Sequence, residues 1–413
     1  MDISVIGLGY IGLPTACLLA RAGHRVMGVD VNERLVDGIN NGATSIDEQD
    51  FLELFRQHRP AAATKPAESD VFIICVPTPL DGTSKACDMS AVRSAAYSVK
   101  GKLRTGNLVI LESTVPAGAS KATVIPILEE SGLKAGRDFH YAYCPERAFP
   151  ESLLNEMVNN CRIIGGFDEE SGRRAETLYR SFVKGEIIRT GMTEAETVKL
   201  MENTYRAVNI ALADEFALIS EKLGIDVWEA IRIANKHPRV GILKPGPGIG
   251  GHCIPIDPLF LVESTESQFI PLAIEISESM PGHVLEQARL VSGKDAPSIL
   301  ILGAAYKGNV NDIRESPSLK MAAIAQQKGW RVGILDPHIQ KYAYSMEEFL
   351  NAVKGCDCVI LATDHSEFRE IDLGGVQGNG KLLVDTRNFL DHKKWEAAGF
   401  RVKVIGNGRQ GRG

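Results

Sequence analysis

One cysteine of the sequence lies in a segment whose composition suits covalent chemistry. Cys253 belongs to the run Gly246-Pro-Gly-Ile-Gly-Gly-His-Cys-Ile-Pro-Ile-Asp257, with glycines on one side of it and prolines on the other. A structural cysteine normally sits inside a periodic apolar run, whereas a reactive thiol needs an accessible, electropositive setting. His252 adjoins the thiol, and Asp257 follows four residues later, where a carboxylate can act as a general base or orient a water molecule. We therefore predict that Cys253 is a nucleophile.

Three polar residues that could assist a thiol share one face of a predicted long helix. Lys199, Asn203 and Arg206 recur at i, i+4 and i+7, within an arc of about 60°. Hydrophobic residues occupy the roughly opposite side, namely Val198, Met201, Tyr205, Val208, Leu212 and Ile219. A polar face of this kind is usually solvated, so the spacing alone leaves both a solvated and a ligand-facing role open.

A glycine-rich turn near the N-terminus predicts a dinucleotide site. Gly7, Gly9 and Gly12, in Gly7-Leu-Gly-Tyr-Ile-Gly12, follow a short apolar strand and open a helical pattern. Glycines suit the tight turn, the close approach of a pyrophosphate and helix–strand packing. Asp30 ends the second predicted strand, where a carboxylate binds ribose hydroxyls and repels a 2′-phosphate, which favours NAD over NADP. Arg34 is close enough to leave NADP open, and a purely structural glycine turn is the weaker alternative.

Three loops that follow predicted strands carry polar side chains. Two of them, Cys75-Val-Pro-Thr-Pro79 and Glu112-Ser-Thr-Val-Pro116, contain Thr78 and Thr114. Ligands of open α/β sheets bind beyond the carboxyl ends of the strands, so these hydroxyls are candidates for the nicotinamide side of the site. Turn-forming threonines beside proline are an equal alternative for either residue. The third loop, Cys144-Pro-Glu-Arg147, offers a carboxylate and a guanidinium that form either part of a site or a surface ion pair.

Short apolar runs alternate with amphipathic segments in both halves of the chain, which predicts parallel sheets of the βαβ type. The expected strands cover residues 3–7, 25–29, 71–76, 108–112, 139–143, 162–165, 298–303, 331–335, 358–362, 382–385 and 402–405. Between the two groups, Thr193 and Glu196 have the spacing of a capping box that opens a helical region to residue 236. A further helical stretch ends near residue 292, and the tail 406–413 offers nothing to pack and is expected to be disordered. The predicted fold class is α/β, with two Rossmann-like domains joined by a central long-helix region.

Three domains follow from these elements: residues 1–190 bind NAD, residues 191–292 form a central helical region with the Cys253 loop, and residues 293–413 form a second α/β domain. In the last domain, Gly303-Ala-Ala-Tyr-Lys307 follows a strand where a phosphate turn would lie, but it lacks the full glycine pattern. A nucleoside diphosphate, with Lys307 as its counter-charge, therefore fits better than a second dinucleotide. Arg314, in the loop that follows, could reach back toward the NAD site.

Composition excludes several classes of protein. The 413 residues include 46 basic and 52 acidic side chains, a net charge of −6 that argues against nucleic acid or a membrane surface as partner. No apolar run approaches the ~18 residues of a membrane span, and the start lacks the pattern of a signal peptide. The eight cysteines form no CxxC pair, which predicts reduced thiols in a cytoplasmic protein and no metal site. Cys356 and Cys358 lie in a strand-like stretch whose alternation puts both thiols on one face, as small core residues rather than metal ligands.

The order of these motifs resembles the nucleotide-sugar 6-dehydrogenase family, the relatives of UDP-glucose and GDP-mannose dehydrogenases. GLGYIG, VPTP, STVP, CPER, the Lys/Asn helix, GPGIGGHCIPIDP and GAAYK follow one another in the family order over nearly the whole chain. Four segments are most similar to the members that act on UDP-N-acetyl-D-mannosamine, namely residues 143–147, 160–166, 202–209 and 234–240, the last with its His-Pro-Arg. GGHCIPIDP is shared with UDP-N-acetylglucosamine enzymes and does not separate the two. One departure is Gly303-Ala-Ala-Tyr306, where many relatives have another small or aromatic residue.

The resemblance implies an enzyme that oxidises the C6 alcohol of a UDP-sugar, most similar to UDP-N-acetyl-D-mannosamine, in two NAD-dependent steps through a thiohemiacetal and a thioester at Cys253. It makes Lys199 a catalytic acid/base near Asn203, and Asp257 or Glu146 the group that orients the hydrolytic water. The UDP-sugar contacts that it implies are Arg147, Ala148, Lys199, Asn203, Arg206, His237, Arg239, Gly250, Tyr306 and Lys307. The implied NAD contacts are Tyr10, Ile11, Asp30, Thr78, Thr114 and Arg314. It also implies a homodimer through the central helix.

Three alternatives remain open on the residues alone. The substrate can be UDP-N-acetylglucosamine or UDP-glucose instead. A single-step hydroxy-acid dehydrogenase shares the plan of an NAD domain and a helical domain, but it needs no thiol and would form one NADH per substrate instead of two. A non-catalytic NAD-sensing protein would have no need of Lys199, Cys253 and Asp257 together.

Overall fold

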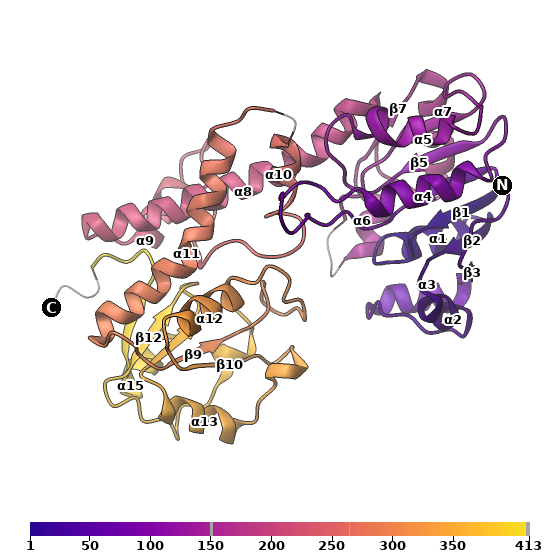
Figure 1. Ribbon diagram of the computed structural model, residues 1–413. Helices are drawn as coiled ribbons and strands as arrows, with labels where there is room; N and C mark the ends of the chain where they lie inside the picture. The colour runs from indigo at the N-terminus through magenta and orange to yellow at the C-terminus, as the bar shows by residue number, and fades with distance from the viewer. Residues whose placement is uncertain (149–151, 264, 410–413) are drawn as a thin grey trace. The chain divides into compact units, whose positions relative to one another are not determined.

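The computed structural model describes residues 1–148, 152–263 and 265–409, which form two compact units. The first comprises Met1–Glu202 with Leu259–Thr265, and the second comprises Asn203–Pro258 with Glu266–Gly413. Helix α8 (Met192–Leu223) and helix α10 (Asp257–Val262) contribute to both units (Figure 1). In the described part of the chain, no helix has the length and apolar character needed to cross a lipid bilayer. The division into three domains stays a prediction.

The first unit contains an eight-stranded sheet with the order β3-β2-β1-β4-β5-β6-β7-β8. Its strands are β1 (Asp2–Ile6), β2 (Arg25–Val29), β3 (Ala61–Ala63), β4 (Val71–Ile74), β5 (Leu108–Leu111), β6 (His140–Tyr143), β7 (Arg162–Gly166) and β8 (Ile187–Gly191). All neighbouring strands run parallel except β6 and β7, which are antiparallel. Strand order reverses between β1 and β4, and sheets of this kind bind ligands in the crevice at the carboxyl ends of such a pair.

Helices cover both faces of this sheet, and each face has its own apolar cluster. Along β4, Val71 and Ile73 belong to one cluster and Phe72 and Ile74 to the other, because successive side chains of a strand point to opposite faces. The helices are α1 (Gly12–Arg21), α2 (Glu33–Asn40), α3 (Gln49–His58), α4 (Ser90–Lys100), a π-helix (Ser120–Val124), α5 (Ile125–Glu129), α6 (Leu153–Asn159) and α7 (Glu169–Tyr179).

The second unit contains a five-stranded parallel sheet with the order β10-β9-β11-β12-β13. Its strands are β9 (Ile299–Leu302), β10 (Val332–Leu335), β11 (Cys358–Leu361), β12 (Leu382–Asp385) and β13 (Arg401–Val404). The helices are α9 (Val227–Ala234), α11 (Phe269–Ser292), α12 (Pro317–Gln327), a 3-10 turn (Gln340–Tyr342), α13 (Met346–Gly355), α14 (Glu367–Glu370) and α15 (His392–Ala397). Here the strand order reverses between β9 and β11, so this unit also offers a crevice for a nucleotide.

The predicted fold class is confirmed, and the predicted strands agree with the observed ones to within about two residues. Strands β3 and β8 were not predicted, and neither was the antiparallel pairing of β7 with β6. A period-two alternation is the same for either strand direction, so it carries no information on this point. Cys356 and Cys358 are both buried, as predicted, but they belong to different apolar clusters, so the prediction that they share a face is wrong.

Two local predictions are also wrong. The carboxylate of Glu196 does not cap α8; it is fully buried and accepts hydrogen bonds from the N–H groups of Gly118 (2.6 Å) and Ser120 (2.9 Å). The tail packs in part, since the Gly406 N–H donates to Glu221 (2.8 Å) and the Gly408 N–H to the Ile225 carbonyl (2.8 Å). In both cases a distant partner decides the local conformation. Residues 410–413 lie outside the described residues.

Candidate functional site

The turn between β1 and α1 has the shape of a pyrophosphate-binding loop. Gly7 has a φ of +93°, and a Cβ there would lie 2.7 Å from the Cys75 carbonyl oxygen. A Cβ at Gly12 would lie 1.8 Å from the Gly7 carbonyl oxygen, so packing excludes a side chain at both positions. Gly9 differs, because a Cβ there would meet no protein atom within 4 Å. The bare backbone at Gly9 therefore faces open space at the start of α1, which suits the approach of a pyrophosphate.

Asp30, at the end of β2, is held against this turn. Its Oδ2 accepts a hydrogen bond from the Leu8 N–H (2.9 Å), and its Oδ1 accepts one from the Asn32 N–H (2.9 Å). The carboxylate is thus fixed where the ribose of a dinucleotide would lie. Arg34 is exposed in the first turn of α2, and its backbone N–H donates to Asn32 (3.1 Å).

The other predicted NAD contacts of the first unit lie around the same edge of the sheet: Tyr10 and Ile11 in the turn, Thr78 beyond β4 and Thr114 beyond β5. Thr78 is buried and Thr114 is half-buried. The Ser113 hydroxyl donates to the Val76 carbonyl (2.7 Å), which ties the two threonine loops together. These loops follow neighbouring parallel strands at the crevice, as their sequence positions predicted.

A buried polar network that the sequence analysis missed lies beneath these loops. The Glu112 carboxylate, 3% exposed, accepts hydrogen bonds from the Tyr179 hydroxyl (2.5 Å), the Cys75 thiol (3.0 Å) and the Thr15 hydroxyl (3.3 Å). It also pairs with the buried Arg162 guanidinium (3.3 Å). Burial raises the pKa of Glu112, and the positive charge of Arg162 opposes that rise. The available signal was an acidic residue directly after an apolar strand.

Arg162 joins this network to the Cys-Pro-Glu-Arg loop. Its guanidinium lies 2.6 Å from Glu146 and above the ring of Tyr179, and its own side chain is 4% exposed. The other oxygen of Glu146 accepts the N–H groups of Arg147 (2.6 Å) and Ala148 (2.9 Å). Glu146 therefore anchors its loop through a buried cation, and the alternative of a surface pair with Arg147 is wrong. Arg147 pairs instead with Glu202 and the Cys161 carbonyl.

Helix α8 buries part of its polar face and exposes much of its apolar side. Lys199 and Asn203 are 8% and 7% exposed, so their face is not a solvated one. On the opposite side, Met201 (55%) and Tyr205 (66%) are exposed, together with Leu212 and Ile219. Buried polar groups need hydrogen-bond partners. The partner of Asn203 lies in the second unit.

In the second unit, the amide of Asn203 meets the acid that follows Cys253. Its Nδ2 donates to the Asp257 Oδ2 over 2.6 Å, and Asp257 is 3% exposed. The Cys253 carbonyl accepts the N–H groups of Ile256 (3.1 Å) and Asp257 (2.9 Å), which closes a turn between the thiol and the acid. Cys253 itself is exposed, whereas five of the other cysteines are buried. An accessible thiol therefore lies one turn from a buried carboxylate, and their roles as nucleophile and helper stay predictions.

The loop after β9 packs directly on the glycines before Cys253. A Cβ at Gly250 would lie 2.6 Å from the Tyr306 Cβ, and the Gly251 N–H donates to the Arg314 carbonyl (2.9 Å). Burial lowers the pKa of His252, and the charge of Arg314 lowers it further. The pKa of Arg314 is raised chiefly by its hydrogen bonds to Asp312, with a smaller contribution from the Cys253 sulfur. Arg314 is thus a cationic neighbour of the thiol within this unit, and its contact with NAD stays a prediction.

Four further predicted substrate contacts have different settings. Lys307 is exposed on the loop that follows β9, at the crevice of the second sheet. Arg206 is half-buried on α8. His237 and Arg239 are exposed on the turn after α9, where the Arg239 N–H lies 3.3 Å from the His237 Nδ1.

Asp336 occupies in the second unit the position that Asp30 occupies in the first. It follows β10, is fully buried, and its Oδ2 accepts the N–H groups of Ala304 (2.6 Å) and Ala305 (3.0 Å) from the turn after β9. Oδ2 also meets His365 (3.0 Å), and Oδ1 accepts the N–H groups of His338 (2.7 Å) and Ile339 (3.0 Å). A carboxylate occupied in this way cannot also bind a ribose, which argues against a second dinucleotide.

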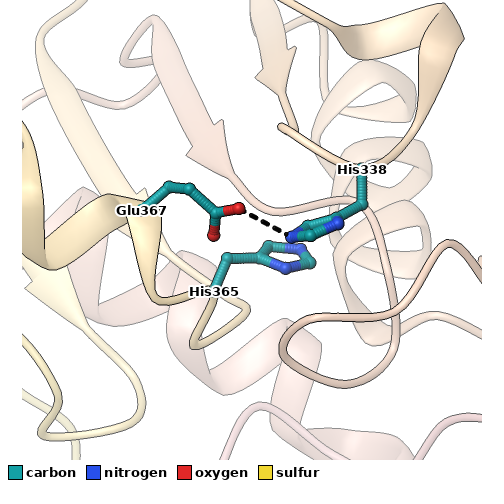
Figure 2. Close-up of side chains that lie close together, drawn as sticks. All are labelled: His338, His365 and Glu367. Carbon is teal, nitrogen blue, oxygen red and sulfur yellow. Dashed lines mark ion pairs between the residues drawn. The ribbon is translucent and has the colours of Figure 1, made fainter. Parts of the chain in front are cut away.

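One set of side chains in the described residues comes close enough to hold a metal ion: His338, His365 and Glu367 (Figure 2). Its geometry does not fit one. The two imidazole rings are stacked with centroids 4.7 Å apart, so their in-plane lone pairs do not converge. The nitrogens of His365 are occupied as well, since Nδ1 accepts the Asn309 N–H (2.9 Å) and Nε2 meets Asp336 (3.0 Å). His338 pairs with Glu367 over 3.0 Å. The cluster instead connects the segments that follow β10 and β11 through hydrogen bonds and ring stacking.

The sequence and the fold both match known proteins over nearly the whole chain. Residues 1–183 match the NAD binding domain of the UDP-glucose/GDP-mannose dehydrogenase family, residues 193–279 its central domain and residues 300–392 its UDP binding domain. A UDP-N-acetyl-D-mannosamine dehydrogenase of Methanococcus maripaludis is 45% identical over 98% of this chain and 97% of its own. An NDP-N-acetyl-D-galactosaminuronic acid dehydrogenase of Ralstonia nicotianae is 39% identical over 95% of this chain and 97% of its own. The solved UDP-D-ManNAc dehydrogenase of Pyrococcus horikoshii has a TM-score of 0.91 and 40% identity, and covers 99% of this chain and 100% of its own.

These matches confirm the predicted family, the enzyme class and NAD as the cofactor. The glycine turn with Asp30 fits NAD in the first unit, and the second unit carries the UDP binding domain. The chain belongs to the UDP-glucose/GDP-mannose dehydrogenase family and is an NAD-dependent oxidoreductase.

Proposed function

We propose that this protein oxidises UDP-N-acetyl-D-mannosamine at C6 to UDP-N-acetyl-D-mannosaminuronate. The relatives of that name support the substrate, since they match the chain from end to end. The single observation that carries the chemistry is the exposed Cys253 thiol, one turn before the buried Asp257 and beside Arg314. A one-step alcohol dehydrogenase has no use for a thiol in that position.

The reaction removes four electrons from the substrate, two at a time. NAD+ supplies the chemistry of hydride acceptance, once for each oxidation. The alcohol first loses a proton and a hydride to become an aldehyde, and the Cys253 thiolate adds to it to form a thiohemiacetal. Loss of a second proton and hydride leaves a thioester, and water cleaves the carbon–sulfur bond to release the carboxylate and the thiol. The balance is one water consumed and two hydrides removed for each sugar.

The other proposed catalytic residues have distinct tasks in this scheme. Lys199, as an ammonium, stabilises the alkoxide and the tetrahedral oxyanions and exchanges protons with them. Asp257, oriented by Asn203, positions the water that attacks the thioester. The involvement of Glu146 in pairing with Arg162 and with two backbone N–H groups favours Asp257 over Glu146 for this task.

The remaining predicted residues are proposed to bind the two ligands. The UDP-sugar contacts are Arg147, Ala148, Lys199, Asn203, Arg206, His237, Arg239, Gly250, Tyr306 and Lys307. The NAD contacts are Gly7, Gly9, Tyr10, Ile11, Gly12, Asp30, Arg34, Thr78, Thr114 and Arg314. The protein has a net charge of −6, so an anionic diphosphate needs cations placed locally at its site. The lysines and arginines of the first set would supply them.

Counting NADH per sugar tests the reaction. The protein with UDP-N-acetyl-D-mannosamine should form two NADH per sugar and release no aldehyde. Cys253→Ser should nearly abolish uronate formation while NAD still binds, because a serine hydroxyl is a far weaker nucleophile than a thiolate. Uronate formation by the serine variant at the unaltered rate, or one NADH per sugar in the native protein, would contradict the covalent scheme.

A second candidate differs only in the sugar. The relative from Ralstonia nicotianae is named for an N-acetyl-D-galactosaminuronic acid, so another N-acetylhexosamine epimer is the competing substrate. Initial rates with UDP-N-acetylmannosamine, UDP-N-acetylglucosamine, UDP-N-acetylgalactosamine, UDP-glucose and GDP-mannose decide between them. The highest kcat/KM should belong to UDP-N-acetylmannosamine.

We also propose that the protein acts in the cytoplasm as a homodimer paired through α8. The exposed Met201, Tyr205, Leu212 and Ile219 on that helix support an apolar partner surface, because a second copy would remove them from water. The absence of a spanning helix from the described residues is compatible with this setting.

A further inference from the structure

The loop that carries Cys253 begins on a buried carboxylate of α8. The Gly246 N–H donates to the Asp214 Oδ1 over 2.8 Å, and Asp214 is 0% exposed. Three residues further along, the Ile249 N–H donates to the Ser277 hydroxyl of α11 over 3.0 Å, and Ser277 is 3% exposed. Two buried side chains from two helices therefore hold the start of the loop, and Cys253 follows Gly246 by seven residues.

The sequence makes Asp214 hard to replace as the partner of this backbone group. Pro245 and Pro247 have no N–H, so Gly246 offers the only backbone donor in that stretch. A buried N–H without a partner is strongly unfavourable. An apolar residue at position 214 would leave this donor unsatisfied.

Two glycines of the loop lie close to neighbouring segments. A Cβ at Gly246 would lie 2.6 Å from the Arg387 Nη1, and a Cβ at Gly248, whose φ is +111°, would lie 2.8 Å from the Ser277 carbonyl oxygen. The loop thus runs between the half-buried Arg387 guanidinium and the backbone of α11. If its hydrogen bond to Asp214 is lost, movement of the loop is the remaining way to solvate the Gly246 N–H.

The charged and polar groups that face Asp214 come from three other segments: the Gly246 N–H, the Arg387 guanidinium after β12 and the Ser277 hydroxyl of α11. Burial raises the pKa of Asp214 to about 7, and these three groups oppose that rise. Its Oδ2 makes no hydrogen bond within the described part of the chain. Asp214 is thus a buried acid whose Oδ1 hydrogen bond to the Gly246 N–H is its link to the loop.

We propose that Asp214 is a positioning residue that holds the glycine-rich loop so that the Cys253 thiol is presented to the sugar C6. The proposal rests on the proposed function for the identity of the reaction, but not for the loop geometry. Asp214 acts through the loop and does not itself touch the substrate.

Two substitutions at position 214 distinguish a residue that positions the loop from one that only fills space in the core. Asp214→Asn keeps an oxygen acceptor for the Gly246 N–H and removes the titration, so turnover should stay within about threefold of native at pH 8. Asp214→Leu keeps a similar volume and removes the acceptor, so turnover should fall about tenfold or more. Val353→Ala in α13 is the matched control, since it destabilises the buried core of the same unit without touching the loop.

The rate at which iodoacetamide alkylates Cys253 reports the setting of the thiol in the absence of substrate. Mass spectrometry of the peptide that contains Cys253 measures this rate. Asp214→Leu should change this rate at least threefold, whereas Asp214→Asn and Val353→Ala should not. If Asp214→Leu fails to fold, Asp214→Ala takes its place, and hydrogen exchange of the peptide containing Gly246 should be faster than in the native protein. Native-like alkylation, exchange and turnover in the leucine or alanine variant would overturn the proposal. Because alkylation and exchange need no sugar, failure of the native protein to form uronate would count against the proposed function alone.

Discussion

Asn203 donates a hydrogen bond of 2.6 Å from its side-chain amide to the carboxylate of Asp257, with both residues almost fully buried. The pair joins α8 to the first residue of α10, four residues after the thiol of Cys253. Because the amide can only donate through Nδ2, it fixes one carboxylate oxygen of Asp257, the residue proposed to orient the hydrolytic water.

Asp257→Asn should therefore stall the reaction after the second oxidation. The thioester forms without the help of Asp257, but its hydrolysis loses a positioned base, so steady-state turnover should fall by roughly 10²-fold or more. A burst of about two NADH per active site should precede the slow phase, and intact-mass measurement should find the acyl group on Cys253. Loss of the burst along with the steady state would instead assign Asp257 to the oxidations.

Lys199→Ala should lower kcat by roughly 10²-fold or more, since in the proposed scheme it removes the ammonium that stabilises the oxyanions. Lys222→Ala on the last turn of the same helix is the control, because Lys222 is exposed. Its kcat should match the native value. Equal turnover of the two variants would reduce Lys199 to a packing residue.

Arg162→Met should destabilise the first unit by about 3 kcal/mol, because it leaves the buried Glu112 and the half-buried Glu146 without their cation. Urea unfolding followed by tyrosine and tryptophan fluorescence would measure the loss. Arg173→Ala, which breaks an exposed ion pair with Glu170 on α7, should leave the urea midpoint unchanged. An unchanged midpoint for Arg162→Met would contradict a stabilising role for its two ion pairs.

The stability of the native protein relative to Asp214→Asn should fall as the pH rises from about 4 to about 7. In this window the folded carboxyl, with its pKa raised to about 7, keeps a proton that the unfolded chain has already released. Because only the unfolded chain loses a proton in this window, rising pH favours unfolding. The free energy of unfolding should fall by an amount on the order of a few kcal/mol relative to Asp214→Asn. Urea midpoints of the two proteins at pH 5 and pH 8 provide the comparison. A difference that stays constant between these pH values would show that Asp214 has an ordinary pKa.

Tyr205→Glu should convert a dimer to a monomer, because it places a charge on the exposed apolar side of α8. Light scattering after size-exclusion chromatography gives the mass directly. Met346→Glu, on the exposed surface of α13, is the matched control and should leave the mass unchanged. A native protein that is already monomeric would contradict the proposed dimer.

Much of the site was predictable from the sequence because its chemistry is local. The glycines of the turn after β1, the acid at the end of β2 and the thiol among glycines and prolines each owe their predicted role to neighbours within a few residues. The alternation of apolar residues likewise placed the strands, since a buried strand must present apolar groups to both faces of its sheet. The family order of the motifs added the substrate class.

Tertiary structure alone decided which polar groups are buried and with what. Helical spacing put Lys199 and Asn203 on one face of α8, but only packing shows that this face is the buried one and that Met201 and Tyr205 are exposed. Glu196 had the spacing of a cap and found distant backbone donors instead. Glu112 with Arg162, and Asp214 with Gly246, are separated by tens of residues, and no periodicity links them. A buried charge or N–H takes whichever partner the fold brings within reach, and that choice is made in three dimensions.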